Sequence, residues 1–319
     1  MSATLPPERA GPIDDWAALR ERSNRVALRF MAWVAVSLGR PVARLLLHPI
    51  SLYYLVFARQ ARRHSARYLG RVLGRPPTLG ERYRHVHDFA ATVLDRVYFV
   101  RAELLAFDLD VHGAEIVDQA LAEGRGALLL GAHIGSFEAL HALGEDRSGL
   151  RVAMAMYPDN ARMIQAVLQA LAPDFELGII AIGRPGSTLA IRDWLDGGGL
   201  VGMLGDRHAA SVSGHSANSV DIPFLGVPVR FTDGPLRLAA LLRRKVIFMV
   251  ALYRGGRRYE LRFETLADFT TPSTDPAQRE LRIQQALLDY VARLEALVRE
   301  APFNWFNFFD FWHEDTPPG

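Results

Sequence analysis

Short apolar runs alternate with amphipathic stretches along the second two-thirds of the chain. Each run has the length of a buried strand, and the stretches between them have the spacing of helices. The runs are ALLLGAH (127–133), RVAMAMY (151–157), LGIIAIG (177–183), LVGML (200–204) and VIFMVALY (246–253). Strands that alternate with helices predict an α/β fold, with a mostly parallel central sheet sandwiched by helices. YELRFETL (259–266) predicts an antiparallel neighbour of the last run, and residues 278–299 predict a closing helix.

The first third of the chain has a different pattern, without strand-like runs. Residues 79–107 carry apolar side chains at mostly helical spacing and predict a long helix. Gly113 then opens the alternating regime. We therefore expect an N-terminal helical segment over residues 1–110 and an α/β core over residues 111–319.

The apolar stretches between Val26 and Phe57 are interrupted too often to cross a bilayer. Arg29, Arg40, Arg44 and the His48–Pro49 pair break every window of roughly 20 apolar residues, which is the length that a spanning helix needs. A basic cluster follows at Arg59, Arg62, Arg63 and Arg67. Arginines beside a face rich in Leu, Trp and Tyr are typical of helices that lie in the membrane interface. The alternative is a pair of hydrophobic helices packed on the rest of the protein, and both interpretations stay open.

Composition narrows the functional classes. Of the 319 residues, 23% are charged and the formal net charge is only +2, which excludes wholesale disorder and does not favour nucleic acid as a partner. The chain has no cysteine, so disulfides, thiolate metal sites and a cysteine nucleophile are excluded.

The segment LLLGAHIGSFE (128–138) carries the candidate chemistry. In a parallel sheet, ligands bind beyond the carboxyl ends of the strands, and His133 follows such an end. If His133 lies in the turn before a helix and Glu138 in its first turn, the carboxylate can reach one imidazole nitrogen and leave the other free as a base. Gly131 and Gly135 permit tight turning and close approach of a substrate, and the helix start offers N–H groups to an oxyanion. The alternative is a strand-end histidine with a purely structural role.

HIGSFE resembles the H-x4-D/E motif of glycerolipid-type acyltransferases, in the carboxylate variant of the bacterial lipid A late acyltransferases. The resemblance covers most of the chain. It continues through YPDN (157–160), the segment from Gly183 to Arg207, IPFLGVPVRFTDGPLRLA (222–239) and the aromatic NWFNFFDFW (304–312).

The resemblance implies transfer of a fatty acyl group from a thioester, on acyl carrier protein or coenzyme A, to a hydroxyl of a membrane lipid acceptor. His133 would be the general base and Glu138 its orienting partner. Arg184 would bind an anionic group of a substrate, Asp206 would help to shape the site, and Gly135 and Ser136 would contact substrate. No cofactor and no metal is expected. The family implies a peripheral, monotopic location on the cytoplasmic face of the inner membrane.

Two departures from the family pattern leave parts of the site open. The strand VIFMVAL lacks a proline that the family usually carries, which leaves the lining of the donor-side tunnel open. The aromatic C-terminal block is less basic than a phosphorylated disaccharide would favour, which leaves the acceptor open. A lipid A precursor, an aryl polyene, an ornithine lipid or another glycolipid all remain as candidates.

Two other functions and one docking surface remain as hypotheses. GHSAN (214–218) nearly matches the nucleophile elbow of an α/β-hydrolase, with Ser216 as nucleophile, but a polar loop precedes it. A degenerate family member would bind lipid without turning it over. Arg243, Arg244, Lys245, Arg254, Arg257 and Arg258 bracket one strand, and on a shared face they would dock an acidic carrier protein.

Overall fold

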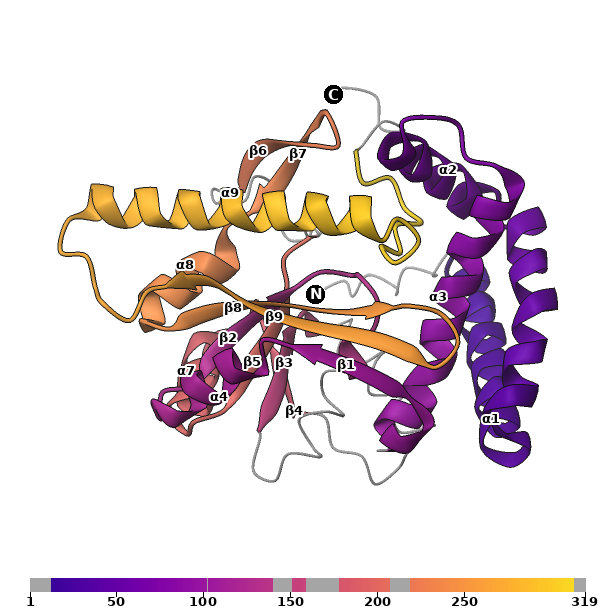
Figure 1. Ribbon diagram of the computed structural model, residues 1–319, viewed down its shortest axis with the longest axis horizontal. Helices are drawn as coiled ribbons and strands as arrows, with labels where there is room; N and C mark the ends of the chain where they lie inside the picture. The colour runs from indigo at the N-terminus through magenta and orange to yellow at the C-terminus, as the bar shows by residue number, and fades with distance from the viewer. Residues whose placement is uncertain (1–12, 102, 140–150, 159–177, 207–218, 313–319) are drawn as a thin grey trace, which may run out of the picture.

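A computed structural model describes residues 13–101, 103–139, 151–158, 178–206 and 219–312, with side chains from residue 33 onward. Seven strands form the central sheet, in the order β1-β9-β8-β2-β5-β3-β4 (Figure 1). Their bounds are β1 Asp108–His112, β2 Ala127–Gly131, β3 Val152–Met156, β4 Gly178–Ala181, β5 Leu200–Leu204, β8 Lys245–Tyr253 and β9 Arg258–Asp268. The β8–β9 pair is antiparallel and every other pair is parallel. The predicted mostly parallel sheet, with one antiparallel neighbour of β8, is confirmed.

Helices cover both faces of this sheet, which confirms the predicted sandwich. Figure 1 shows α9 (Pro276–Glu300) lying along one face, and the buried residues of α7 (Ser187–Asp196) belong to the same apolar cluster as those of α9. α4 (Ala114–Ala122) packs on the opposite face, in the second cluster. Consecutive residues of β2 point to opposite faces, as the pleat requires. Leu128 and Leu130 join the apolar cluster of α9, whereas Leu129 joins the cluster that contains α3 (Leu79–Val100). Because β2 is buried on both faces, its sequence is a continuous apolar run.

Three elements were not expected from the sequence. β1 is half-exposed and short, and its DLDVH sequence mixes acids with apolar residues. β6 (Ser219–Phe224) and β7 (Val227–Thr232) form a separate antiparallel hairpin, and each contains a proline. The turn between them is Leu225–Gly226, where both residues have positive φ. That conformation matches the type I′ turn that closes two-residue hairpins.

The N-terminal helices stand at one end of the sheet (Figure 1). α1 (Ile13–Phe57) is interrupted at Gly39, where φ is +79°, and α2 (Arg59–Leu73) follows. α1 packs on α3, and the apolar cluster there includes residues of α1, α3, β8 and β9. The core thus continues across residue 110, and the division of the chain at that point stays a prediction.

Within the described residues, no single helix is long and apolar enough to cross a bilayer. The part of α1 from Trp33 to Phe57 is long and apolar enough only when α2 is added to it, and the two helices meet at an angle of 92°. The interruption of the apolar sequence by charges and prolines, noted above, is consistent with this finding.

Candidate active site

His133 lies just beyond the carboxyl end of β2, in the turn before a helix that begins at Phe137. This is the position that the sequence predicts. The side chain of His133 is 32% exposed, so the imidazole is accessible from outside the protein. Glu138 is the second residue of the helix, again as predicted.

The partner of the imidazole is Asp206, not Glu138. Nδ1 of His133 lies 2.8 Å from Oδ1 of Asp206, and the backbone N–H of His133 donates to Oδ2 of the same carboxylate at 3.0 Å. The geometry follows from strand register, because Gly131 of β2 pairs with Leu204 of β5. His133 and Asp206 each come two residues after one member of this pair. The expected contact between Glu138 and the imidazole is therefore wrong.

The Asp206 carboxylate is almost completely buried, with 1% of its side chain exposed. A carboxylate accepts hydrogen bonds, so the proton of a neutral imidazole belongs on Nδ1, and Nε2 keeps its lone pair. The indole Nε1 of Trp305 also donates to Oδ2 of Asp206, at 3.0 Å. Both carboxylate oxygens are thus engaged, and the His133 ring is held in one orientation.

Glu138 contacts other residues. Its Oε1 lies 3.0 Å from Nε of Arg96 on α3, and its Oε2 accepts a hydrogen bond from the Ser136 hydroxyl at 3.1 Å. Both charged side chains are partly exposed. The two residues link α3 to the start of the helix after His133. Arg96 was not anticipated, because nothing in the spacing of α3 distinguishes it from other surface arginines.

Gly135 allows the turn after His133 to lie close to the backbone of β8; the contact is with backbone and not with substrate. Its φ is +64°, and a Cβ on it would lie 1.7 Å from the carbonyl oxygen of Ala251 on β8. The N–H groups of Gly135 and Ser136 donate to the carbonyls of Asn304 and Ala251. These two amides are therefore occupied and are not available to an oxyanion. The Ser136 side chain is fully buried, so it does not offer a surface to substrate in this structure.

Arg184 is not close to His133. It follows β4, which is the edge strand, and β3 and β5 lie between β4 and β2. At about 4.8 Å per strand, three steps across the sheet correspond to roughly 14 Å. Arg184 is exposed, and its backbone N–H donates to the Ser187 hydroxyl. It follows the carboxyl end of an edge strand, at the same end of the sheet as His133.

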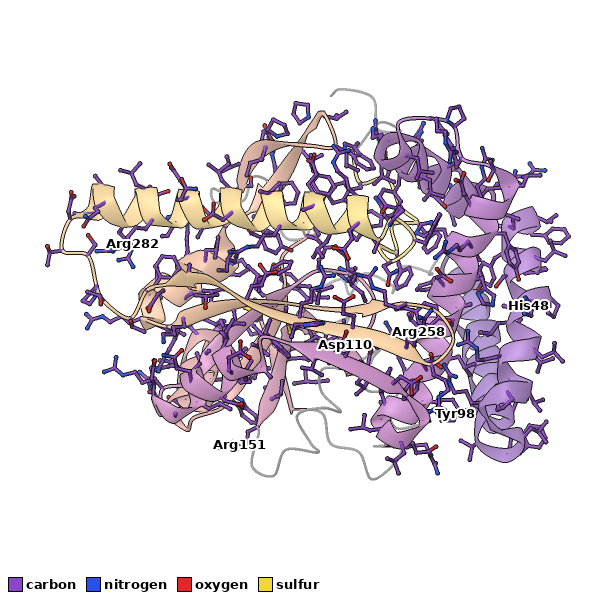
Figure 2. All side chains as sticks on the ribbon, viewed as in Figure 1. His48, Tyr98, Asp110, Arg151, Arg258 and Arg282 are labelled. Atoms are coloured by element: carbon purple, nitrogen blue, oxygen red, sulfur yellow. The ribbon has the colours of Figure 1, made fainter. Side chains whose placement is uncertain are left out.

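The six basic residues around β8 do not form one patch. β8 has nine residues, about 30 Å of strand, and Arg243–Lys245 lie at the opposite end from Arg254–Arg258. Arg258 lies on the turn near α3 in Figure 2. Several of the charges are neutralised by acids: Arg244 pairs with Asp196, Lys245 with Glu123, Arg257 with Asp108, and Arg254 with Glu260 and Glu300. The condition for carrier docking, one shared basic face, is therefore not met, because the two groups lie at opposite ends of β8 and several of their charges have acidic partners.

The hydrolase candidate Ser216 lies outside the described residues. Within the described ranges, no group of three or more His, Asp or Glu side chains is placed to hold a metal ion. His85 has a structural role: it is buried, its Nε2 lies 2.9 Å from the Trp305 carbonyl, and its Nδ1 lies 2.7 Å from the Ser65 hydroxyl. Burial lowers the pKa of His85 to about 4, so the ring is neutral at physiological pH.

An accessible imidazole backed by a buried carboxylate, at the carboxyl end of a central strand, is an arrangement that can deprotonate a hydroxyl. The sequence matches the model of the bacterial lipid A biosynthesis acyltransferase family over residues 21–314. The chain belongs to this family. It is therefore an acyltransferase of the lipid A biosynthesis type, and the resemblance seen in HIGSFE is confirmed at the level of the family. No curated protein is a significant match to the sequence.

Proposed function

We propose that the protein transfers a fatty acyl chain from an acyl thioester to a hydroxyl of a membrane lipid, with His133 as general base and Asp206 as its orienting partner. The observation that carries the proposal is the 2.8 Å contact between Nδ1 of His133 and the buried Asp206 carboxylate. It leaves Nε2 as the basic nitrogen on an imidazole that is open to the outside.

The reaction needs no covalent enzyme intermediate. Nε2 of His133 takes the proton of the acceptor hydroxyl as the oxygen attacks the carbonyl carbon of the thioester. The carbon–sulfur bond then breaks, and the departing thiolate takes the proton from the imidazolium. Asp206 stabilises the imidazolium while it exists. The products are the new ester and a free thiol, and no nucleophilic cysteine or serine is required.

Glu138 has a supporting place in this proposal. Through Arg96 and Ser136 it fixes the start of the helix after His133, one step away from the imidazole. In this proposal Arg184, which follows the edge strand β4 three strands from β2, binds an anionic group of a large acceptor. The donor is an acyl thioester of acyl carrier protein or coenzyme A, and the acceptor is a lipid A precursor or a related glycolipid.

The outer face of α1 supports a location on the inner membrane, at its cytoplasmic side. Ten large apolar side chains of this helix are exposed, which is unusual for a helix that packs on a core. They are Trp33, Val36, Leu38, Val42, Leu45, Leu52, Tyr53, Tyr54, Val56 and Phe57. An apolar face of this kind, followed by the arginines of α2, suits a helix that lies in the membrane interface.

The proposal is tested by acyl transfer with purified protein. Lipid extracted from cells that lack the gene contains the unacylated acceptor, and acyl carrier protein and coenzyme A thioesters are supplied in parallel. Mass spectrometry should show one lipid gaining an acyl chain, which identifies the acceptor and the preferred donor. His133→Ala should lower kcat by about 10²–10⁴, because the base is lost.

Glu138→Gln is the informative comparison for this experiment. We expect it to retain more activity than Asp206→Asn, because Asp206 touches the imidazole and Glu138 does not. The order should be measured with variants whose thermal stability is matched. Near-normal turnover in folded His133→Ala would rule out the proposed mechanism, and a larger defect in Glu138→Gln than in Asp206→Asn would return the orienting role to Glu138.

A further inference from the structure

The segment Asn304–Phe306 lies directly against the turn that carries His133. The Asn304 carbonyl accepts from the N–H of Gly135 at 2.9 Å, and the Phe306 N–H donates to the His133 carbonyl at 3.2 Å. Between these two contacts, the Trp305 indole donates to Asp206. One short segment therefore holds the backbone of His133 from one side and its carboxylate partner from the other.

Trp305 itself is rigidly held. It is 1% exposed, and its ring packs edge-to-face on Tyr68 at 4.9 Å and on Phe311 at 4.8 Å, measured between ring centroids. Its carbonyl pairs with the buried His85 ring. A buried aromatic ring with neighbours on several sides has one available rotamer, so the direction of its N–H is fixed.

We propose that Trp305 is a positioning residue for acyl transfer, which acts through Asp206 and does not touch substrate. The inference rests on the proposed function, since it concerns the same imidazole. Oδ2 of Asp206 accepts from Trp305 and from the His133 N–H, and this orientation of the carboxylate directs Oδ1 at Nδ1 of His133. Without the indole donor the carboxylate has more freedom to rotate, and the imidazole spends less time in the orientation that serves as a base.

The chain offers a matched control for this residue. Trp312 belongs to the same aromatic cluster, with its ring 6.2 Å from that of Trp305. Its indole nitrogen is buried and has no hydrogen-bond partner among the described residues. Trp305→Phe and Trp312→Phe thus remove similar volume from one cluster, but only the first removes a donor to Asp206.

The test is steady-state kinetics of both variants with the donor and acceptor lipid that the wild-type protein uses. We expect Trp305→Phe to lower kcat by about 10- to 100-fold with little change in KM, the size expected for a hydrogen bond to a charged group. Trp312→Phe should leave both constants near those of the wild type. Equal kinetic effects of the two substitutions would overturn the inference, as would a Trp305→Phe defect confined to KM.

A second comparison separates this inference from the proposed function. In an Asp206→Asn background, Trp305→Phe should add little, because its effect passes through that carboxylate. Full additivity would overturn the inference. If His133→Ala and Asp206→Asn are fully active, the proposed function itself fails. Should Trp305→Phe not fold, replacement of Trp305 by β-(3-benzothienyl)alanine removes the N–H while keeping the ring shape, and the same fall in kcat is expected.

Discussion

Two of the buried carboxylates in the described part of the chain, Asp95 and Asp206, have different surroundings. Asp95 on α3 has no exposed side-chain surface and is paired with cations. Arg40 of α1 donates to both of its oxygens, at 2.8 and 2.9 Å, and the Tyr259 hydroxyl donates at 2.9 Å. Asp206 is equally buried, but its partners in the contacts described above are an imidazole, an indole and a backbone N–H.

The difference in partners gives the two aspartates different roles. A guanidinium keeps its charge at any physiological pH, so the Arg40–Asp95 pair is static and can only hold α1 against α3. An imidazole changes its charge during acid–base chemistry, so a carboxylate beside it stabilises one state of a cycle. Burial raises the pKa of Asp95 although Arg40 and Arg44 oppose that shift, which shows that desolvation of this carboxylate is costly.

The largest effect on stability is expected at the Arg40–Asp95 pair. Arg40→Ala leaves the buried Asp95 carboxylate without its main partner, and we expect a loss of about 3–5 kcal/mol in the free energy of unfolding. Chemical denaturation measures this loss. The kcat of the molecules that remain folded should change little, because Arg40 contacts α3 and the β8–β9 turn rather than His133.

If Arg40→Ala lowers kcat as strongly as Asp206→Asn does, the assignment of a purely structural role to the Arg40–Asp95 pair is wrong. The control is Asp95→Asn, which removes the buried negative charge. The double variant should recover part of the stability lost in Arg40→Ala, because the unpaired charge is gone.

A smaller effect is expected at His85, which is buried as a neutral group. Its pKa in the folded protein is about 4, below the ordinary value of 6.5. Between these values the unfolded chain binds a proton that the folded protein does not, so stability should fall as the pH is lowered from about 6.5 to about 4. The loss is about 3 kcal/mol, and thermal melts across this range measure it.

His85→Gln is the control for this pH dependence, because glutamine keeps an N–H donor for the Trp305 carbonyl and does not titrate. The slope of stability with pH between 6.5 and 4 should flatten in this variant. An unchanged slope would assign the pH dependence to other groups.

The smallest effect on stability is expected on the outer face of α1. Leu45, Tyr53 and Phe57 are 69%, 60% and 66% exposed, so their replacement by glutamate should leave the melting temperature nearly unchanged. Binding to vesicles of anionic and neutral phospholipid should weaken strongly in a flotation assay, because charged side chains enter the interface poorly. Retained flotation would place the membrane contact elsewhere, and a large loss of stability would show that this face is covered by protein.

Much of the fold could be predicted because the strands are buried on both faces and therefore appear as apolar runs. His133 could be found because it follows such a run. Its partner could not, since Asp206 lies 73 residues further on, and the pairing depends on β2 and β5 being neighbours while β3 and β4 intervene in sequence. Trp305 lies 99 residues from Asp206. The block NWFNFFDFW indicated the family, but nothing in the sequence around it predicts its hydrogen bonds to the site.

The active site depends on Asn304, Trp305 and Phe306, which lie near the C-terminal end of the chain, so it cannot form until most of the chain has been synthesised. A growing polypeptide leaves the ribosome from its N-terminal side, so α1 emerges long before residues 304–306 do. Its apolar face can therefore meet a lipid surface while the segment that holds His133 and Asp206 has yet to be made. If α1 binds the membrane as proposed, a nascent chain attaches to the lipid surface before its active site has formed.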